Sequence, residues 1–390
     1  MHMPVSHKLF SLVLTTVIAA GIASPGKAET PAQALPFTDM SECDTASVNA
    51  IGEAYWAGLT SGTSATTFGP EETVSREQMA TFVTRTLDGS ARFSRRASMN
   101  RWATPKGIAQ MGTTELGGVL MYAVSDGGNI WAADASGGRI LKVEANSGRL
   151  LETWTGASGV FSLASAMGKI YGVSNTGSLY ELDPQKTPGD VRIIATTSPL
   201  LAGPTNLIFD GSLLWVIGYK GVSLVNPQAK GPWSVITQDT GFHGLTGAIY
   251  DGTHIWVTDF TAGTLLELDE NAGIIRTVAV GPGPMYPAFD GINIYVPKFT
   301  ADAVSVVHAA NGKILGELTG NGLNGPESVT SDGERILVTN FHGDSVSIWH
   351  ATNLKAMGEV STGVDSFPTF ACSDGINFWI TLQSGLLVRF

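Results

Sequence analysis

Five polar side chains in the C-terminal half of the chain have the types and spacing to bind a ligand together. They are Asp259, Tyr286, Lys298, Glu327 and Asn340, and each stands near the end or the start of a short apolar run. Carboxylates, an ammonium, a phenol and a carboxamide supply both donors and acceptors of hydrogen bonds. A pocket with a few convergent polar groups is the usual form of a ligand site. We expect these side chains to form one, and the alternative is a solvated rim with one lysine–acid pair.

Sequence motifs for catalysis are missing from this set and from the rest of the chain. There is no His-Glu-x-x-His, no closely spaced cysteine pair for zinc and no Gly-x-Ser-x-Gly. His243, His342 and Glu327 come nearest to a metal-binding set, but neither histidine recurs at the same position one repeat away. We therefore expect no catalytic residue, no bound metal and no cofactor. A divalent cation remains part of the alternative, which is an enzyme.

The elements that must position these residues repeat along the chain. A turn, usually Asp-Gly, precedes a short run with an aromatic or large apolar residue, and the steps between successive turn glycines are 41, 43, 41, 39, 42 and 42 residues. A period of 40–45 residues with several short strands is the signature of a β-propeller. We predict a mainly β fold with a seven-bladed propeller over residues 105–390. Its turn glycines are Gly127, Gly168, Gly211, Gly252, Gly291, Gly333 and Gly375.

The fourth repeat shows the expected strands most clearly. They are Gly247–Tyr250, Ile255–Thr258, Thr264–Leu268 and Ile274–Val280. The glycine of Asp-Gly accepts positive φ, while the aspartate bonds to its own backbone. The aromatic position recurs once per repeat, so we expect it to pack between adjacent sheets. Its residues are Trp131, Tyr171, Trp215, Trp256, Tyr295, Leu337 and Trp379.

The strand order brings the ends of the second strands and the starts of the inner strands to one face of the propeller, around the channel. The second strands are expected to end at Asp134, Ser174, Gly218, Asp259, Lys298, Asn340 and Leu382. The last repeat lacks a fourth strand. We expect Gly107–Met111 to supply it and to close the ring, which removes exposed sheet edges.

The amino-acid sequence of the repeats resembles YVTN-type and NHL-like propeller repeats. The nearest copy is Gly325-Pro326-Glu327-Ser328, followed by Ser331–Asn340 and Ser345–Ile348. The resemblance covers residues 105–390 and implies the fold more strongly than a function. Related propellers include streptogramin lyases of the virginiamycin B lyase kind, which hold a magnesium ion with histidine and glutamate, and cell-surface binding proteins.

Residues 37–90 have a helical period instead. Asp44 or Thr45 can cap a first helix, a loop follows over residues 58–69, and Ser75 with Gln78 forms a capping box for a second helix. This segment resembles an S-layer homology (SLH) motif in the order and spacing of five short matches. They are Phe37-Thr38-Asp39, Ala50-Ile51, Gly58–Gly62, Phe68-Gly69-Pro70 and Ser75-Arg76-Glu77-Gln78.

The SLH resemblance implies attachment to a cell-wall polysaccharide. Arg76 is the matched residue for contacting an acidic sugar, since a guanidinium pairs a carboxylate through two hydrogen bonds. The motif occurs once here, where such anchors usually carry three copies. It also has Ser-Arg-Glu-Gln in place of Thr-Arg-Ala-Glu.

The remaining segments and the composition bear on localisation. Residues 1–28 have the charged start, apolar run and small residues of a secretory signal peptide, cleaved after Ala28, with an uncleaved anchor as the alternative. Residues 91–104 form a basic linker. The net charge of −11 argues against a nucleic-acid partner. Cys43 and Cys372 are the two cysteines, and they either pair or remain buried thiols.

We therefore expect a secreted protein of the cell wall or cell surface, with no transmembrane segment after cleavage. Its SLH-like module would bind cell-wall polysaccharide, and its propeller would bind an unknown protein, peptide or glycan without catalysis. The alternative is a propeller enzyme, streptogramin-lyase-like or a hydrolase, with a divalent metal in the central channel.

Overall fold

The computed structural model describes residues 35–44, 47–48, 51, 63, 66–70, 107–189, 191–195, 203–227 and 235–390. The chain divides into two compact units, Met1–Trp102 and Ala103–Phe390. The predicted signal peptide, the linker and Arg76 lie outside the described residues. Within the described residues, no helix is long and apolar enough to span a bilayer.

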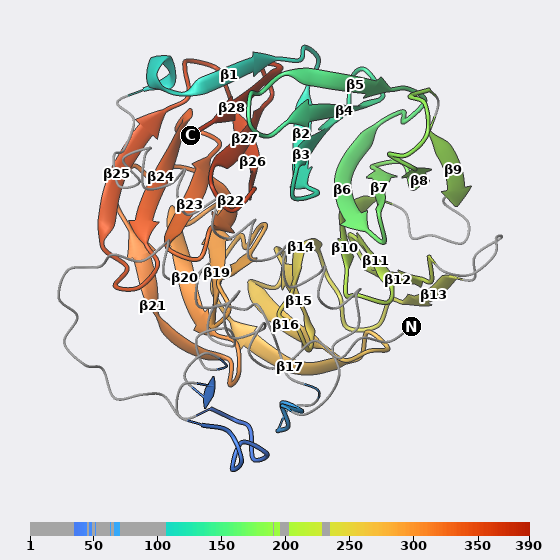
Figure 1. Cartoon of the computed structure of the whole chain (residues 1–390). Helices are drawn as coiled ribbons and strands as arrows, with labels where there is room; N and C mark the ends of the chain where they lie inside the picture. The colour runs from blue at the N-terminus through green and yellow to red at the C-terminus, as the bar shows by residue number, and fades with distance from the viewer. Residues whose placement is uncertain are drawn as a thin grey trace. The chain divides into compact units, whose positions relative to one another are not determined.

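The described part of the second unit is a seven-bladed β-propeller, as predicted. Seven antiparallel four-stranded sheets surround a central channel (Figure 1). Blade 1 contains β2 (Leu120–Ser125), β3 (Asn129–Asp134), β4 (Arg139–Glu144) and β5 (Leu150–Trp154). Blade 2 contains β6 (Val160–Ala166), β7 (Lys169–Ser174), β8 (Leu179–Leu182) and β9 (Arg192–Ala195). Blade 3 contains β10 (Pro204–Phe209), β11 (Leu214–Gly218), β12 (Gly221–Val225) and β13 (Val235–Gln238).

The remaining blades follow the same order from the channel outward. Blade 4 contains β14 (Leu245–Tyr250), β15 (Ile255–Asp259), β16 (Thr264–Leu268) and β17 (Ile274–Ala279). Blade 5 contains β18 (Ala288–Phe289), β19 (Asn293–Lys298), β20 (Ala303–His308) and β21 (Lys313–Thr319). Blade 6 contains β22 (Pro326–Ser331), β23 (Arg335–Asn340), β24 (Ser345–His350) and β25 (Ala356–Ser361). Blade 7 contains β26 (Pro368–Ser373), β27 (Phe378–Leu382) and β28 (Leu386–Arg389). Each second strand ends at the residue that the sequence predicts.

The last blade takes its fourth strand from the start of the unit. Strand β1 (Gly112–Glu115) pairs with β28, with Thr113 opposite Val388. Closure of the ring is therefore confirmed, but the segment predicted for it was wrong. Ile108–Gln110 forms a 3₁₀ turn (η1) in which the N–H of Met111 bonds to the carbonyl of Ile108, so the strand begins only at Gly112.

The inner strand of blade 5 is the shortest of the described inner strands. It contains Ala288 and Phe289 alone, because the preceding segment holds Pro282, Pro284 and Pro287. Proline has no N–H to donate to a sheet ladder. Tyr286, which lies between Pro284 and Pro287, instead donates its N–H to the carbonyl of Glu327 in blade 6, at 3.0 Å.

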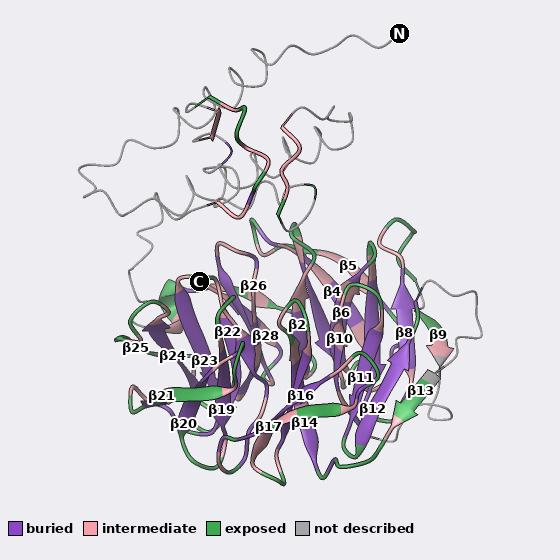
Figure 2. Cartoon of the chain, turned by 90° about the horizontal axis from the view of Figure 1, so that it is seen from below, coloured by how far each residue is buried: buried purple, intermediate pink, exposed green. Residues whose placement is uncertain are grey.

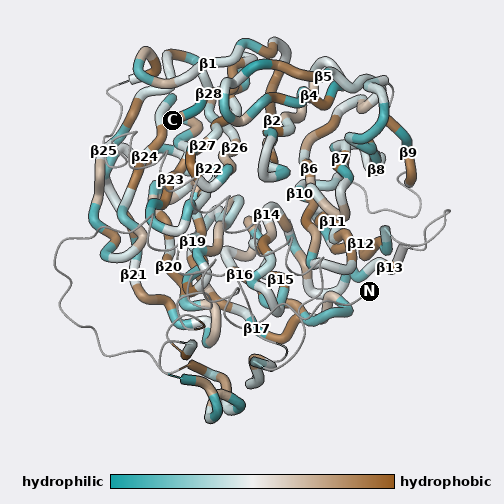
Figure 3. Tube along the Cα trace, in the orientation of Figure 1, coloured by the Kyte–Doolittle hydropathy of each residue, from teal (hydrophilic) through white to brown (hydrophobic). Residues whose placement is uncertain are grey.

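The hydrophobic core lies between the blades. The seven repeated aromatic or large apolar residues have at most 1% of their surface exposed, which confirms their packing role. Figure 2 shows buried strands through the body and exposed segments on outer strands such as β21 and β13. In Figure 3, hydrophobic stretches recur in blade after blade.

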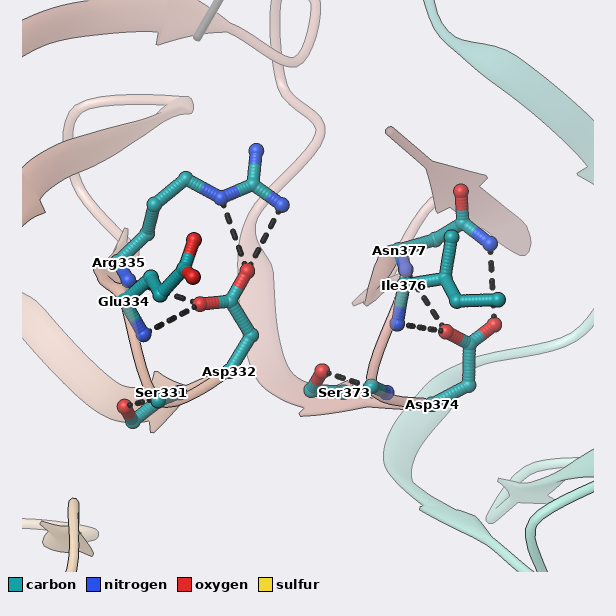
Figure 4. Close-up of polar contacts among 10 residues, drawn as sticks. Ser331, Asp332, Glu334, Arg335, Ser373, Asp374, Ile376 and Asn377 are labelled. Carbon is teal, nitrogen blue, oxygen red and sulfur yellow. Dashed lines mark hydrogen bonds and ion pairs between the residues drawn. The ribbon is translucent and has the colours of Figure 1, made fainter. Parts of the chain in front are cut away.

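The aspartate of the Asp-Gly turn also anchors the core residue five positions later. Asp126, Asp210, Asp251 and Asp374 each accept a bond from a tryptophan indole at 2.7–2.9 Å, and Asp290 accepts one from the Tyr295 hydroxyl. Blade 6 has Leu337 at this position, and Asp332 there pairs with Arg335 at 2.9 Å (Figure 4). The Arg335 guanidinium lies 4.7 Å from the Phe378 ring centroid.

Candidate functional site

In the first unit, the structure joins the two halves of the SLH-like motif. The Asp39 carboxylate accepts hydrogen bonds from the backbone N–H of Phe68 at 2.9 Å and of Gly69 at 2.8 Å. These bonds lower the pKa of Asp39. The Thr38 N–H donates to the Thr66 carbonyl at 2.9 Å, and the Phe37 and Phe68 rings lie 5.5 Å apart. Segments about thirty residues apart thus form one clasp, in which Asp39 is the central acceptor.

The first helical turn also begins as the sequence suggests. The N–H of Ser47 donates to Oδ1 of Asp44 at 2.6 Å, and the N–H of Val48 donates to the Asp44 carbonyl. Of the two predicted caps, Asp44 therefore makes the capping bond. The second helix and its capping box lie outside the described residues.

In the propeller, the structure gives Asp259 and Lys298 local partners. Asp259 is fully buried at the end of β15, where its carboxylate accepts the N–H groups of His243 at 2.8 Å and Ala262 at 2.9 Å. It therefore ties the turn after β15 to the segment that precedes β14. Lys298 is buried at the end of β19 and forms an ion pair with Glu317 on the outer strand β21.

Asn340 is likewise bonded within its own blade. Its amide Nδ2 donates to Oγ of Ser345 at 3.0 Å and of Ser347 at 2.7 Å. Among the described residues, its Oδ1 is buried without a hydrogen-bond partner. Its amide therefore ties β23 to β24 and leaves one acceptor unused.

Tyr286 and Glu327 are the two predicted residues that the structure brings together. Their backbones bond directly, and the charge of Glu327 adds to burial in raising the pKa of the Tyr286 phenol. Glu327 is 9% exposed, and its Oε2 has no hydrogen-bond partner in the described part of the chain. Burial raises the pKa of Glu327 to about 8, since the charged form has lost its water.

An aromatic group lines the channel at Tyr286. The Tyr122 and Phe370 rings stack with centroids 3.6 Å apart, and Tyr286 meets Phe370 edge-on at 5.8 Å. Asn206 donates from Nδ2 to the Tyr122 hydroxyl at 3.1 Å and accepts the N–H of Ala248 at Oδ1. Sequence reasoning did not single out Phe370, because nothing in its own repeat distinguishes it from a packing residue.

These aromatic residues line a channel cavity of about 460 Å³. Residues from the inner strands of all seven described blades form its wall, and none of the described lining residues is charged. Glu327 is not among them. The cavity therefore suits an uncharged ligand that can pack against aromatic and aliphatic side chains.

The side chains that come nearest to a lyase-type metal set do not converge. His243 is bonded to Asp259, with Nδ1 at 3.3 Å from Oδ2, whereas the His342 ring packs 4.8 Å from the Phe299 ring. In the described ranges, no three His, Cys, Asp or Glu side chains are grouped so that they could hold a metal ion. Divalent cations need several ligands around one point, so the described residues do not fit such a centre.

Comparison with known proteins separates the two units. Residues 36–80 match the S-layer homology domain, which indicates association with the cell surface or cell wall. No curated protein matches the chain.

The propeller is similar to solved structures with unrelated activities. A catalytically inactive virginiamycin B lyase from Staphylococcus aureus has 13% identity and a TM-score of 0.59, with 72% of this chain and 99% of that chain covered. The β-propeller domain of Myceliophteria thermophila Cps50 has 11% identity and a TM-score of 0.60, covering 72% and 99%. Kuenenia stuttgartiensis hydrazine synthase has 15% identity and a TM-score of 0.59, covering 71% and 96%. At these identities the likeness shows the propeller fold, and the chain joins that fold to an S-layer homology segment.

Proposed function

We propose that the protein is secreted and held at the cell wall by its SLH segment, while the propeller presents a ligand-binding face without catalysis. The observation that carries the proposal is the Asp39 clasp. It joins the Phe-x-Asp and Phe-x-Pro parts of the motif through three contacts at 2.8–3.0 Å from two backbone N–H groups, those of Phe68 and Gly69. The match of residues 36–80 to the SLH domain supports the same role.

The polysaccharide contact is assigned to Arg76, the first-turn arginine of the motif. Its fork of N–H donors suits the carboxylate of an acidic sugar better than a lysine would. For the propeller, the ligand-binding residues that we propose are Tyr286, Glu327, Asp259, Lys298 and Asn340. Tyr286 is the member of this set that lines the cavity.

A propeller enzyme is the second candidate, and Glu327 is the observation in its favour. A buried carboxyl with a pKa of about 8 stays protonated at neutral pH and can donate a proton. Glu327, however, does not line the channel cavity. The binding role is therefore the better supported of the two.

The test is retention of the full chain on purified bacterial sacculi that carry or lack their secondary polysaccharide. Asp39→Ala and Arg76→Ala should abolish retention, and Arg76→Lys should keep part of it. Asp269→Ala is the matched control, because Asp269 accepts the N–H groups of Asn271 at 2.9 Å and Gly273 at 2.8 Å in a propeller turn. It should be retained like the unmodified chain.

Two results would overturn the tether. One is that the unmodified chain fails to sediment with sacculi of either kind. The other is that Asp39→Ala and Arg76→Ala remain bound as tightly as the Asp269→Ala control.

A further inference from the structure

One backbone hydrogen bond recurs in all seven described blades and defines equivalent positions at the channel face. The residue after the second strand donates its N–H to the carbonyl of the residue before the inner strand, at 2.8–3.2 Å; in blade 5 the acceptor is Gly283, in the proline-rich segment that precedes β18. In blades 3 to 6 the donors are Tyr219, Phe260, Phe299 and Phe341. Four neighbouring blades therefore place an aromatic residue at the same point of the same face.

Blade 7 carries an aromatic residue on the acceptor side of this bond. Phe367 has φ 45° there, whereas Gly159, Gly203, Gly283 and Gly325 have φ 60–70° at the equivalent positions. A bulky residue in the left-handed region is strained, and strained residues cluster at functional sites. Since glycine occupies this position in five other blades, in four of them with positive φ, the fold itself does not require phenylalanine.

A carboxylate holds the strained segment in place. Asp344 accepts the backbone N–H groups of Asp365 at 2.8 Å and of Ser366 and Phe367 at 2.9 Å. Three convergent bonds to one anion fix the loop before β26. The Phe367 ring is thereby presented beside Phe341, with ring centroids 5.3 Å apart.

These rings come from neighbouring blades, and we call the set the aromatic crescent. It consists of Tyr219, Phe260, Phe299, Phe341 and Phe367. Phe299 and Phe341 lie 6.1 Å apart, and the other crescent phenylalanines are, like them, half-buried.

Polar groups alternate with these rings. An exposed polar residue directly follows the ring in blades 4, 5 and 6, namely Thr261, Thr300 and His342. The Tyr219 hydroxyl lies 3.3 Å from that of Thr261, so one hydroxyl pair already bridges blades 3 and 4.

We propose that the aromatic crescent binds a saccharide chain. A sugar ring offers an apolar C–H face that packs on an aromatic ring and hydroxyls at its rim that bond to polar neighbours. Half-buried rings alternating with hydroxyl and imidazole groups match both features. This inference rests on the proposed function and assigns a ligand class to its channel face.

Other macromolecules fit the crescent less well. A nucleic acid would need basic groups to neutralise its phosphates, and the chain has a net charge of −11. A stable protein interface centres on fully buried aromatic or arginine anchors in a continuous apolar core. No crescent ring is fully buried, and an exposed polar residue directly follows three of them.

The experiment uses the full chain carrying Asp39→Ala and Arg76→Ala, so that the SLH segment does not contribute. Its probes are secondary polysaccharide released from sacculi and chitotriose, measured by affinity electrophoresis and calorimetry. We expect binding to at least one probe, with affinity lowered ten-fold or more by Phe341→Leu and by Phe367→Leu. Leucine keeps apolar volume but lacks a flat ring. Val364 lies in the same loop as Phe367 and is 90% exposed, so the Val364→Ala variant should bind the glycan with unchanged affinity.

Phe367→Gly guards against a folding artefact. It installs the residue that other blades use at this backbone position, so the variant should keep its melting temperature within a few degrees while losing the glycan. Absence of binding to both probes would overturn the inference. So would leucine variants that bind as well as the parent, or binding of a tryptophan-rich apolar peptide in place of the glycans.

The outcomes separate the two proposals. If the unmodified chain stays on sacculi but the double variant binds neither probe, the tether stands and the crescent assignment fails. If the double variant binds glycan through Phe341 and Phe367 while the unmodified chain is not retained, the crescent assignment stands and the tether fails.

Discussion

The indole N–H of Trp379 donates to Oδ2 of Asp374 at 2.9 Å, and Oδ1 of the same carboxylate accepts the N–H groups of Ile376 and Asn377. The carboxylate that shapes the turn, shown with its neighbours in Figure 4, therefore also satisfies a buried core donor. Trp379 is fully buried between the last and first blades, in the cluster with Leu120 and Ile130. Turn chemistry and core packing are thus coupled through one side chain.

Breaking this coupling should destabilise the propeller. We expect Asp374→Asn to lower the free energy of unfolding by about 2–3 kcal/mol, because the buried indole N–H loses its acceptor. In the double variant with Trp379→Phe, the Asp374→Asn cost should shrink by about 1 kcal/mol. Urea denaturation measures these values, and Asp269→Asn in a more exposed turn should cost about 1 kcal/mol or less. Fully additive effects would contradict the coupling.

Gly247 should tolerate no side chain. A Cβ there would lie 2.7 Å from the Tyr286 Cα and 2.8 Å from the Pro287 Cδ, so the inner segments of blades 4 and 5 would have to separate. We expect Gly247→Ala to lower the free energy of unfolding by about 2–3 kcal/mol. Gly316→Ala is the control, since a Cβ there has no atom within 4 Å. Equal stability of the two variants in thermal denaturation would show that the blades can part without cost.

Glu327→Gln should stabilise the protein increasingly as pH rises. The pKa of Glu327 is raised to about 8 in the folded protein, against about 4.3 in an unfolded chain. Below the pKa of the unfolded chain, the carboxyl is protonated in both the folded and the unfolded state. Between the two pKa values, only the unfolded state releases the proton. Native stability is therefore lost as pH rises towards 8. The variant should match the native protein near pH 4 and exceed it near pH 8 by something on the order of a few kcal/mol. A difference independent of pH in urea denaturation would refute this.

For the turn aspartates Asp126 and Asp210, we expect the opposite pH dependence from that of Glu327: their contribution to stability should be lost as pH falls. Burial opposes ionisation of Asp126 and Asp210, but bonds from tryptophan indoles and backbone N–H groups outweigh it and lower both pKa values. Their stabilisation is present above the ordinary aspartate pKa of about 3.9 and is lost as pH falls through the lowered values.

Asp126→Asn and Asp210→Asn should therefore cost stability at pH 7. The cost should shrink below about pH 4, because the native carboxylates are then protonated as well. Unfolding curves across this range, with Glu115→Gln on the exposed part of β1 as control, measure the effect. A cost that persists unchanged at pH 2 would mean that the charge is irrelevant.

Local patterns were enough to predict the blades. Asp-Gly turns, short apolar runs and the period near 42 residues can be recognised in the sequence alone, and the second strands end at Asp259, Lys298 and Asn340 as predicted. Asp44, one of the two predicted caps, makes the capping bond of its helical turn. The crescent is also visible in the sequence, because an aromatic residue directly follows the second strand in each of blades 3 to 6. These residues are Tyr219, Phe260, Phe299 and Phe341.

The sequence by itself determined the blade count, the strand order and the residue at which each second strand ends. Only the tertiary structure decided their partners. Lys298 meets Glu317, Tyr286 meets Glu327, and Phe341 meets Phe367. These pairings depend on distances across strands and between blades, and on the proline-rich segment that replaces most of one inner strand. The closing strand at Gly112 likewise follows from pairing with β28, because a short edge segment has too little pattern of its own to fix its register.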